Sequence, residues 1–267
     1  MHKYVVFLTA KTRLFANFAT LNEKSMVIAT QIKECLAAAD YGMVLTINDF
    51  GIEPRYHATL VKALNRKVAI GELQKVSKGK YYKPKKTVFG SLSPAPSEIV
   101  KDLLEKNGKT VGYITGTAAF ASMGLTTQIT SAIMVGTNRY RRPITRGESK
   151  ISFLVQPNSI TEENIPLLRT LDAIKLIREI PATSPDDSTV VLGKIISALT
   201  KEGLQQLCQL AEAYKPSVRA LLGAILENNN QPTFGLEMTL NGVTTYKLPI
   251  SKMYYPINIT GIFYEIT

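Results

Sequence analysis

Residues 54–86 read PRYHATLVKALNRKVAIGELQKVSKGKYYKPKK, and this stretch decides the N-terminal fold. Ten of these residues are Lys or Arg, and only one is acidic. Pro54 suits the first position of a helix, because a residue there has no use for the amide hydrogen that proline lacks. The apolar spacing predicts a helix to about Ala69, and Gly71 is expected to end it. Two short alternating runs around Lys78-Gly79 then predict a β-hairpin.

Two further helices are predicted before this stretch. Ser25 can cap a helix, and apolar residues recur from there at helical spacing to about Ala39. Residues 43–45 predict a short extended piece. Thr46 is then expected to cap a brief second helix, which Gly51 ends.

Three helices followed by a hairpin predict a winged helix-turn-helix over residues 25–90. Residues 1–24 fit this pattern poorly and are expected to form an N-terminal arm, unless translation begins at Met26. The apolar run near the N-terminus is about seven residues long, which is short for a secretory signal. No stretch approaches the roughly 18 apolar residues of a membrane span. We therefore expect a cytoplasmic protein without membrane attachment.

A second domain is predicted over residues 97–267. The stretch GSLSPAPS at residues 90–97 has the composition of a linker. Beyond it, a helix over residues 98–106, strands in TVGYITG, SAIMVGTNRY and KISFLVQP, and a short helix in TAAFASMG predict a mixed α/β segment. Residues 161–227 predict four helices, and alternation about Asn241-Gly242 predicts a terminal β-hairpin. The predicted fold class is therefore α+β, with a helical C-terminal part.

The formal charge of +11 is distributed unevenly along the chain. Residues 1–90 carry 15 basic and 6 acidic residues, and residues 91–150 carry 8 and 4. Residues 151–267 carry 9 basic and 11 acidic residues. This asymmetry favours a polyanionic partner for the N-terminal half.

Few residues are available for metal binding or nucleophilic catalysis. Cys35 and Cys208 are the only cysteines, which gives neither a disulfide framework nor a zinc motif and favours a reducing compartment. With His2 and His57 as the only histidines, a Ser-His-Asp or Cys-His site in the second domain is excluded. We expect no cofactor and no structural metal.

One face of the helix that begins at Pro54 collects cations and a hydroxyl. Arg55, Thr59, Lys62 and Arg66 fall within about 60° of one another on a helical wheel. In a helix-turn-helix, the exposed face of the second motif helix enters the major groove of duplex DNA. The residues at its N-terminal end that are expected to meet the bases are Arg55, Tyr56, His57 and Thr59. Lys62 and Arg66 are expected to contact phosphates.

The hairpin is predicted to act as a wing that neutralises phosphates without reading sequence. Its cations are Lys75, Lys78, Lys80, Lys83, Lys85 and Lys86. Tyr81 is a candidate for stacking or for a backbone hydrogen bond, although strand alternation places one of Tyr81 and Tyr82 toward the core. The alternative is a solvated charged face, which normally mixes signs, as this stretch does not. Arg139, Arg141 and Arg142 form either a second phosphate-contacting patch or a solvated cluster.

In this order of domains, the chain resembles the AbiEi-like antitoxin family of type IV toxin–antitoxin and abortive-infection systems. The motifs that carry the resemblance are VLTINDFG, ALNRKVAIGELQKVSKGKYYKP, GYITGTAAFASMGLTTQ and VRALLGAILE. The resemblance covers about residues 26–252. It implies a transcriptional autoregulator whose winged helix binds operator DNA through Arg55, Thr59, Lys62, Arg66, Lys78 and Lys80. It also implies a C-terminal domain that counters a cognate nucleotidyltransferase-like toxin, so the chain itself is not expected to be an enzyme.

Two alternatives to the DNA-binding hypothesis remain open. Glu148 and Lys150, with Asp102 upstream, invite a metal-dependent nucleic-acid-processing enzyme, but an acid-x-lysine pattern is common by chance. Alternatively, the chain is an adaptor whose basic face docks an acidic protein. The apolar stripe in LLRTLDAIKLIREI, which starts at Leu167, is expected to be core, with a partner surface as the alternative.

Overall fold

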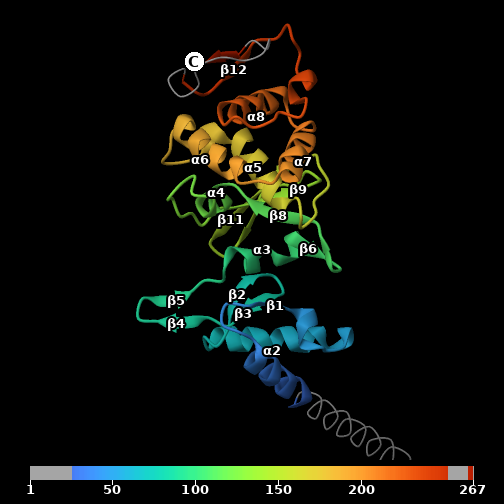
Figure 1. Cartoon of the computed structure of the whole chain (residues 1–267). Coiled ribbons are helices and arrows are strands. Elements are labelled where there is room, and N and C mark those ends of the chain that lie inside the picture. Colours follow the sequence, from blue (N-terminus) through green and yellow to red (C-terminus); the bar gives the residue numbers. More distant parts are fainter. Residues whose placement is uncertain (1–25, 252–263, 267) are drawn as a thin grey trace, which may run out of the picture. The chain divides into compact units, whose positions relative to one another are not determined.

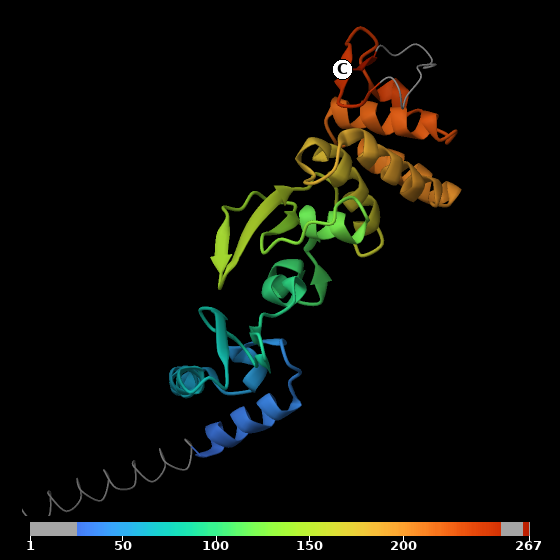
Figure 2. The same cartoon turned by 90° about the vertical axis from the view of Figure 1, so that its left-hand side faces the viewer.

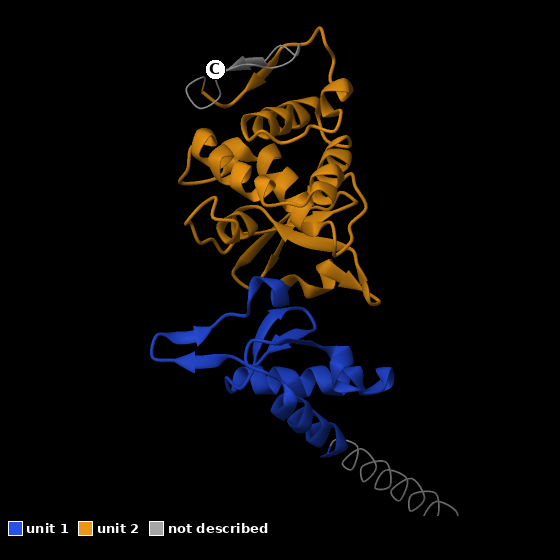
Figure 3. Cartoon of the chain, in the orientation of Figure 1, with its two compact units in different colours: residues 1–99 blue, residues 100–267 orange. Residues whose placement is uncertain are grey.

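The computed structural model of the chain describes residues 26–251 and 264–266, and the arm predicted over residues 1–24 lies outside them. The chain divides into two compact units, residues 1–99 and 100–267 (Figure 3). The fold is mixed α+β, with several small sheets and a helical C-terminal region (Figure 1). None of the helices within the described residues combines the length and hydropathy that a membrane span requires.

The first unit follows the predicted order of elements. Its helical elements are a first helix over residues 26–38, η1 (Ile47–Phe50), η2 (Pro54–Tyr56) and α2 (His57–Ala69). Its strands are β1 (Val44–Thr46), β2 (Gln74–Ser77), β3 (Lys80–Tyr82), β4 (Lys85–Thr87) and β5 (Gly90–Leu92). Thr46 and Asp49 form a capping box at the start of η1, and Gly51 ends it in the left-handed conformation, as predicted. Pro54 opens a 3-10 turn that leads directly into α2.

The predicted hairpin about Lys78-Gly79 is confirmed as β2–β3. It belongs to an antiparallel three-stranded sheet of order β1-β3-β2, in which Val44 pairs with Tyr82. Leu60, Leu64 and Tyr81 have no exposed surface and pack in one core. Neighbouring residues in a strand point to opposite faces of the sheet, and two neighbours are buried in each strand, Val44 and Leu45 in β1 and Tyr81 and Tyr82 in β3. Both faces of this small sheet are therefore covered at these positions.

The stretch predicted as a linker is partly a strand. β4 and β5 pair as a second antiparallel hairpin, in which every residue of both strands is exposed. Phe89 at its tip is 98% exposed. Gly90 and Ser91, whose composition suggested a linker, belong to β5 of this hairpin. The irregular connection is confined to residues 93–95, before α3 (Pro96–Leu104).

The second unit is built on a four-stranded sheet of order β10-β11-β9-β8. Its strands are β8 (Gly112–Thr115), β9 (Ile133–Thr137), β10 (Ile144–Arg146) and β11 (Ser149–Val155), and a separate small hairpin joins β6 (Glu105–Lys106) to β7 (Lys109–Thr110). The β9–β11 pair is parallel and the β8–β9 and β10–β11 pairs are antiparallel. The short helix predicted after β8 is α4 (Thr117–Ser122).

The four predicted C-terminal helices are confirmed and lie to one side of the sheet (Figures 1 and 2). They are α5 (Ile165–Lys175), followed by the turn η3 (Ile177–Glu179), then α6 (Pro185–Ser197), α7 (Lys201–Ala211) and α8 (Pro216–Asn228). Ser184 and Thr200 accept backbone N–H hydrogen bonds as N-caps, and Pro216 occupies the first turn of α8. The apolar stripe from Leu167 to Ile177 is buried in the core of this unit, as expected.

The predicted terminal β-hairpin about Asn241-Gly242 is wrong. Residues before it form η4 (Leu236–Thr239), and β12 (Tyr246–Leu248) pairs in parallel with β13 (Tyr264–Ile266). The Asn241 side chain accepts a hydrogen bond from Val243 N (2.9 Å), which makes a local turn in place of a hairpin turn. Burial of Leu236 in the core prevents the preceding segment from extending as a strand.

Candidate nucleic-acid interface

The exposed face of η2 and α2 carries the predicted cations. Arg55, Thr59, Lys62 and Arg66 are all exposed, whereas Leu60 and Leu64 on the opposite side are fully buried. This division follows from the helical period, because residues three and four positions apart share a face. A row of two arginines, one lysine and one hydroxyl therefore faces water along the helix.

Arg55 is not an isolated cation. Its guanidinium forms an ion pair with Glu53 at 2.5 Å and lies 5.1 Å from the centre of the Tyr56 ring. Glu53 stands one residue before the basic stretch, so the charge count over residues 54–86 omitted it. A DNA phosphate or base at this position would have to compete with this carboxylate for Arg55.

His57 and Tyr56 contribute to the local structure. The ring Nε2 of half-buried His57 lies 3.0 Å from the carbonyl oxygen of Ile52, to which a protonated Nε2 donates. This hydrogen bond ties the start of α2 to the loop that precedes it. Tyr56 is also half-buried, beneath the Arg55 guanidinium. Both residues sit at the predicted end of the helix, but only part of each side chain is accessible.

The hairpin β2–β3 presents lysines but no aromatic ring. Lys75 and Lys78 are exposed and Lys80 is half-exposed. Tyr81 has 0% exposure, and its hydroxyl donates to Asn65 Oδ1 at 3.2 Å. The prediction that Tyr81 contacts DNA is therefore wrong. Strand alternation predicts that one of Tyr81 and Tyr82 faces solvent, but both faces of this sheet are covered. Tyr82 is therefore buried as well.

Lys83 does not extend the cationic surface of the hairpin. Its Nζ donates to the carbonyl oxygen of Leu36 at 3.3 Å and lies 4.5 Å from the centre of the Tyr41 ring. With Lys85 and Lys86 it lines a groove whose walls come from three separate segments of the chain. No spacing pattern within one segment could have shown this groove.

In the second unit, the predicted Arg139, Arg141 and Arg142 differ from the nearby Arg146 in their surroundings. Arg139, Arg141 and Arg142 are exposed on the loop after β9, and the Arg141 guanidinium lies 5.8 Å from the Phe153 ring. Arg146, on β10, is buried and binds both carboxylate oxygens of Asp102 at 2.6 and 2.9 Å. This bidentate pair joins the C-terminal part of α3, residues 100–104, to β10 within the second unit.

The residues of the enzyme alternative do not converge on a metal site. Glu148 and Lys150 are exposed, and Asp102 is engaged by Arg146. Within the described parts of the chain, no group of three or more His, Cys, Asp or Glu side chains is placed to hold a metal ion.

The second unit also contains a buried polar network centred on Asp172. Its carboxylate accepts hydrogen bonds from the hydroxyls of Tyr113 (2.6 Å), Thr115 (2.9 Å) and Tyr214 (3.0 Å). Gln156 Nε2 donates to the hydroxyl oxygens of Tyr113 (2.8 Å) and Tyr214 (2.6 Å). Burial raises the pKa of the Asp172 carboxyl, and the hydroxyl donors oppose that rise. Sequence reasoning missed this network because its members come from four places far apart in the chain: β8, α5, the residue after β11 and the turn after α7.

A family model matches residues 31–207, and its description is a family of unknown function, DUF6088. The chain belongs to the DUF6088 family. The matched range of this DUF6088 protein includes most of the first unit and the sheet of the second, and ends within α7. No curated protein matches the chain.

The fold of this DUF6088 protein is similar to that in the crystal structure of RV2827C protein from Mycobacterium tuberculosis. The TM-score is 0.57 at 14% sequence identity, and the similarity covers 80% of this chain and 82% of that chain. At this identity the likeness concerns the fold alone.

Proposed function

We propose that the first unit is a winged helix-turn-helix that binds duplex DNA, and that the protein regulates transcription. The order first helix, β1, η1, α2 and the β2–β3 hairpin, with the strand order β1-β3-β2, supports this architecture. The observation that carries the proposal is the division of α2 into a buried apolar face and an exposed cationic face. In this proposal α2 is the recognition helix, and β2–β3 is the wing.

The proposed DNA contacts are of two kinds, contacts to base edges and contacts to phosphates. Thr59 and Arg55, at the N-terminal end of the recognition helix, are assigned to base edges, with Glu53 released from Arg55 when DNA binds. Lys62 and Arg66 are assigned to phosphates. The wing adds phosphate contacts from its exposed lysines, Lys75, Lys78 and Lys80.

A salt titration tests the DNA contacts. We expect the chain to bind its own promoter DNA in a fluorescence anisotropy assay, with log affinity falling linearly with log salt concentration. Lys62→Ala should weaken binding and reduce that slope by about 0.9, because one phosphate contact is lost. Lys194→Ala, an exposed lysine on α6, is the matched control and should leave both unchanged. Absence of any binding at low salt would refute the proposal.

We further infer an antitoxin role from the AbiEi-like motifs, with the second unit countering a nucleotidyltransferase-like toxin. The exposed Arg139, Arg141 and Arg142 support a polyanion-facing surface on that unit. Co-expression with a toxin encoded beside the chain tests this role. We expect growth to be restored by the wild type and by Lys62→Ala, because only the second unit is assigned to toxin control. Failure of the wild type to restore growth would reject the antitoxin role and leave DNA binding untouched.

A further inference from the structure

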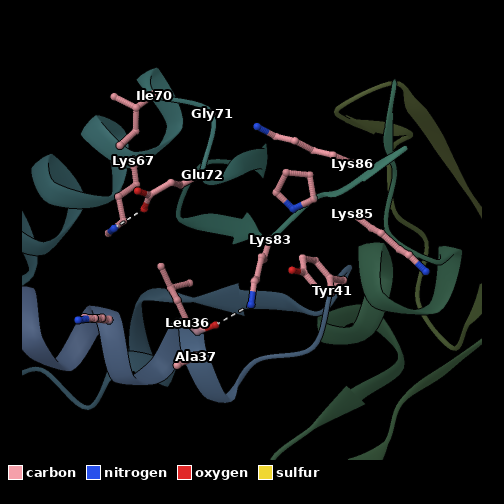
Figure 4. Close-up of a pocket in the computed structure, with 12 residues that line it drawn as sticks. Leu36, Ala37, Tyr41, Lys67, Ile70, Gly71, Glu72, Lys83, Lys85 and Lys86 are labelled. Atoms are coloured by element: carbon pink, nitrogen blue, oxygen red, sulfur yellow. Dashed lines mark hydrogen bonds and ion pairs between the residues drawn. The ribbon is translucent and has the colours of Figure 1, made fainter. Parts of the chain in front are cut away.

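The first unit contains a groove of about 790 Å³ that the proposed DNA contacts do not use. Its walls are the end of the first helix, the end of α2 with the turn after it, and residues 83–86 (Figure 4). All of these segments belong to the first unit.

The floor of this groove is largely apolar. Leu36 and Ala37 contribute from the first helix, and Pro84 from the strand segment. Ile70, directly after α2, is 68% exposed, and Tyr41 is 60% exposed. Large apolar side chains with that much contact to water are a marker of interaction surfaces when they are grouped.

The rim of the groove is cationic. Lys67 is paired with Glu72, the single acidic residue of the lining, and Lys83 is held by Leu36 and Tyr41. Lys86 extends toward the Gly71 turn, whereas Lys85 points away from the groove (Figure 4). Among the residues that the structure describes, neither Lys33 nor Lys86 has an ion-pair partner. Two ammonium groups, from two different segments of the groove lining, are therefore available to a ligand.

The groove lies at the far end of α2 from the proposed base-reading residues. The 13 residues of α2 span roughly 20 Å at 1.5 Å per residue. Arg55 precedes the helix and Ile70 follows it. A ligand in the groove can therefore bind without displacing DNA from the N-terminal end of α2.

The combination of floor and rim selects the chemistry of the ligand. A phosphodiester backbone would satisfy Lys33 and Lys86 but would leave the exposed Ile70 and Tyr41 in contact with water. A helix with acidic and apolar residues on one face matches both the rim and the floor of the groove. Its carboxylates pair with the lysines while its apolar side chains cover the floor. The volume is also within the roughly 300–1,000 Å³ that is typical of ligand-binding clefts.

We propose that this groove binds an acidic amphipathic segment of a partner protein. The lysines at the rim orient the segment, and the apolar floor supplies most of the affinity. This inference does not depend on DNA binding by α2. The protein would then carry two independent faces, one for a polyanion and one for a peptide.

The probe for the test is a fluorescein-labelled synthetic helix of glutamate and leucine, with the leucines on one face, titrated against the full chain. We expect saturable binding that Ile70→Asp weakens by at least about tenfold, the size of effect typical for a central apolar contact. Lys86→Glu should also weaken it. Ile129→Asp is the matched control, because Ile129 is 95% exposed in the second unit and should have no effect.

Three comparisons make the result decisive. Lys62→Glu should weaken promoter binding and leave peptide binding unchanged, whereas Ile70→Asp should weaken peptide binding and leave promoter binding unchanged. A scrambled peptide of equal charge without an apolar face should bind at least about tenfold more weakly, since charge alone does not cover the floor. Equal binding of both peptides, or insensitivity to Ile70→Asp, would overturn the proposal. A labelled single-stranded oligonucleotide that binds in place of the peptide and requires Lys33 and Lys86 would overturn it as well.

Discussion

At the scale of single residues, the Asp172 network shows a consistent direction of hydrogen bonding. The Gln156 amide donates both of its N–H groups to Tyr113 and Tyr214, so each phenol must donate its own proton onward to Asp172. A carboxylate can accept all three hydroxyl donors, whereas an amide cannot. Networks of this kind are costly when one member is mismatched.

We expect Asp172→Asn to destabilise the second unit by roughly 1–3 kcal/mol, because its N–H₂ group would face hydroxyls that are already committed as donors. Urea denaturation followed by far-UV circular dichroism measures this change. Glu163→Gln makes the same acid-to-amide change at an exposed position and should be neutral. Equal effects of the two substitutions would contradict the role given to the network.

Cys208 and Cys35 should differ in reactivity. Burial raises the pKa of the Cys208 thiol to about 11, so only about one molecule in a hundred carries the reactive thiolate at pH 9. Cys35 is half-exposed, and burial also raises the pKa of its thiol. We expect iodoacetamide to modify Cys35 slowly in the folded protein and Cys208 only after denaturation, as read by mass spectrometry. Stoichiometric modification of native Cys208 at pH 8 would contradict this.

The same pKa shift has a consequence for stability. The pKa of Cys208 is higher in the folded state, at about 11, than the ordinary thiol pKa of 9.0. Burial of the protonated thiol therefore makes its full contribution to the free energy of unfolding only below pH 9.0. The free energy of unfolding should therefore decline as pH rises from about 9 through about 11. Cys208→Ala would remove this part of the alkaline decline.

At the scale of elements, those with strong local signals were predicted and those set by tertiary contacts were not. The cap at Thr46 and the hairpin at Lys78-Gly79 are signalled by adjacent residues, and the structure contains both. The hairpin expected at Asn241-Gly242 failed because burial of Leu236, which no local pattern encodes, controls that segment. Tyr81 was misassigned for a related reason, since the sequence does not show that its sheet is covered on both faces. In the candidate site, the helix face was predictable, whereas the Glu53 pair and the groove depend on three-dimensional placement.

The pairing of β8 with β9 depends on a glycine. Gly136 lies opposite Tyr113, and a Cβ at position 136 would stand 2.5 Å from the Tyr113 ring. Because Tyr113 is held by Asp172 and Gln156, the ring cannot move aside without breaking hydrogen bonds. We expect Gly136→Ala to lower the stability of the second unit by roughly 1–3 kcal/mol in a urea titration. Gly242→Ala, where nothing lies within 4 Å of the added Cβ, is the control and should have little effect.

At the scale of the whole molecule, the two units carry separate cores and unequal charge: residues 1–99 have 15 basic and 7 acidic residues, whereas residues 100–267 have 17 and 14. Leu64 belongs to the core of the first unit and Leu222 to that of the second, and neither has exposed surface. The excess of basic residues lies before residue 151. Separate cores imply that damage to one unit need not spread to the other.

Core truncation in each unit tests this separation. We expect Leu64→Ala and Leu222→Ala each to cost roughly 2–5 kcal/mol locally, by loss of packing and creation of a cavity. Hydrogen exchange mass spectrometry should show faster exchange within residues 26–99 for the first variant and within residues 100–251 for the second. Equal acceleration in both units by either variant would indicate a single cooperative fold.

The β4–β5 hairpin offers a spectroscopic opportunity. The chain contains no tryptophan, and the ring of Phe89 at the hairpin tip makes almost no contact with the rest of the protein. An indole placed there by Phe89→Trp would be the single tryptophan of the chain, so no other indole would contribute to its emission. Its colour and quenching would reveal which ligands approach that tip in solution.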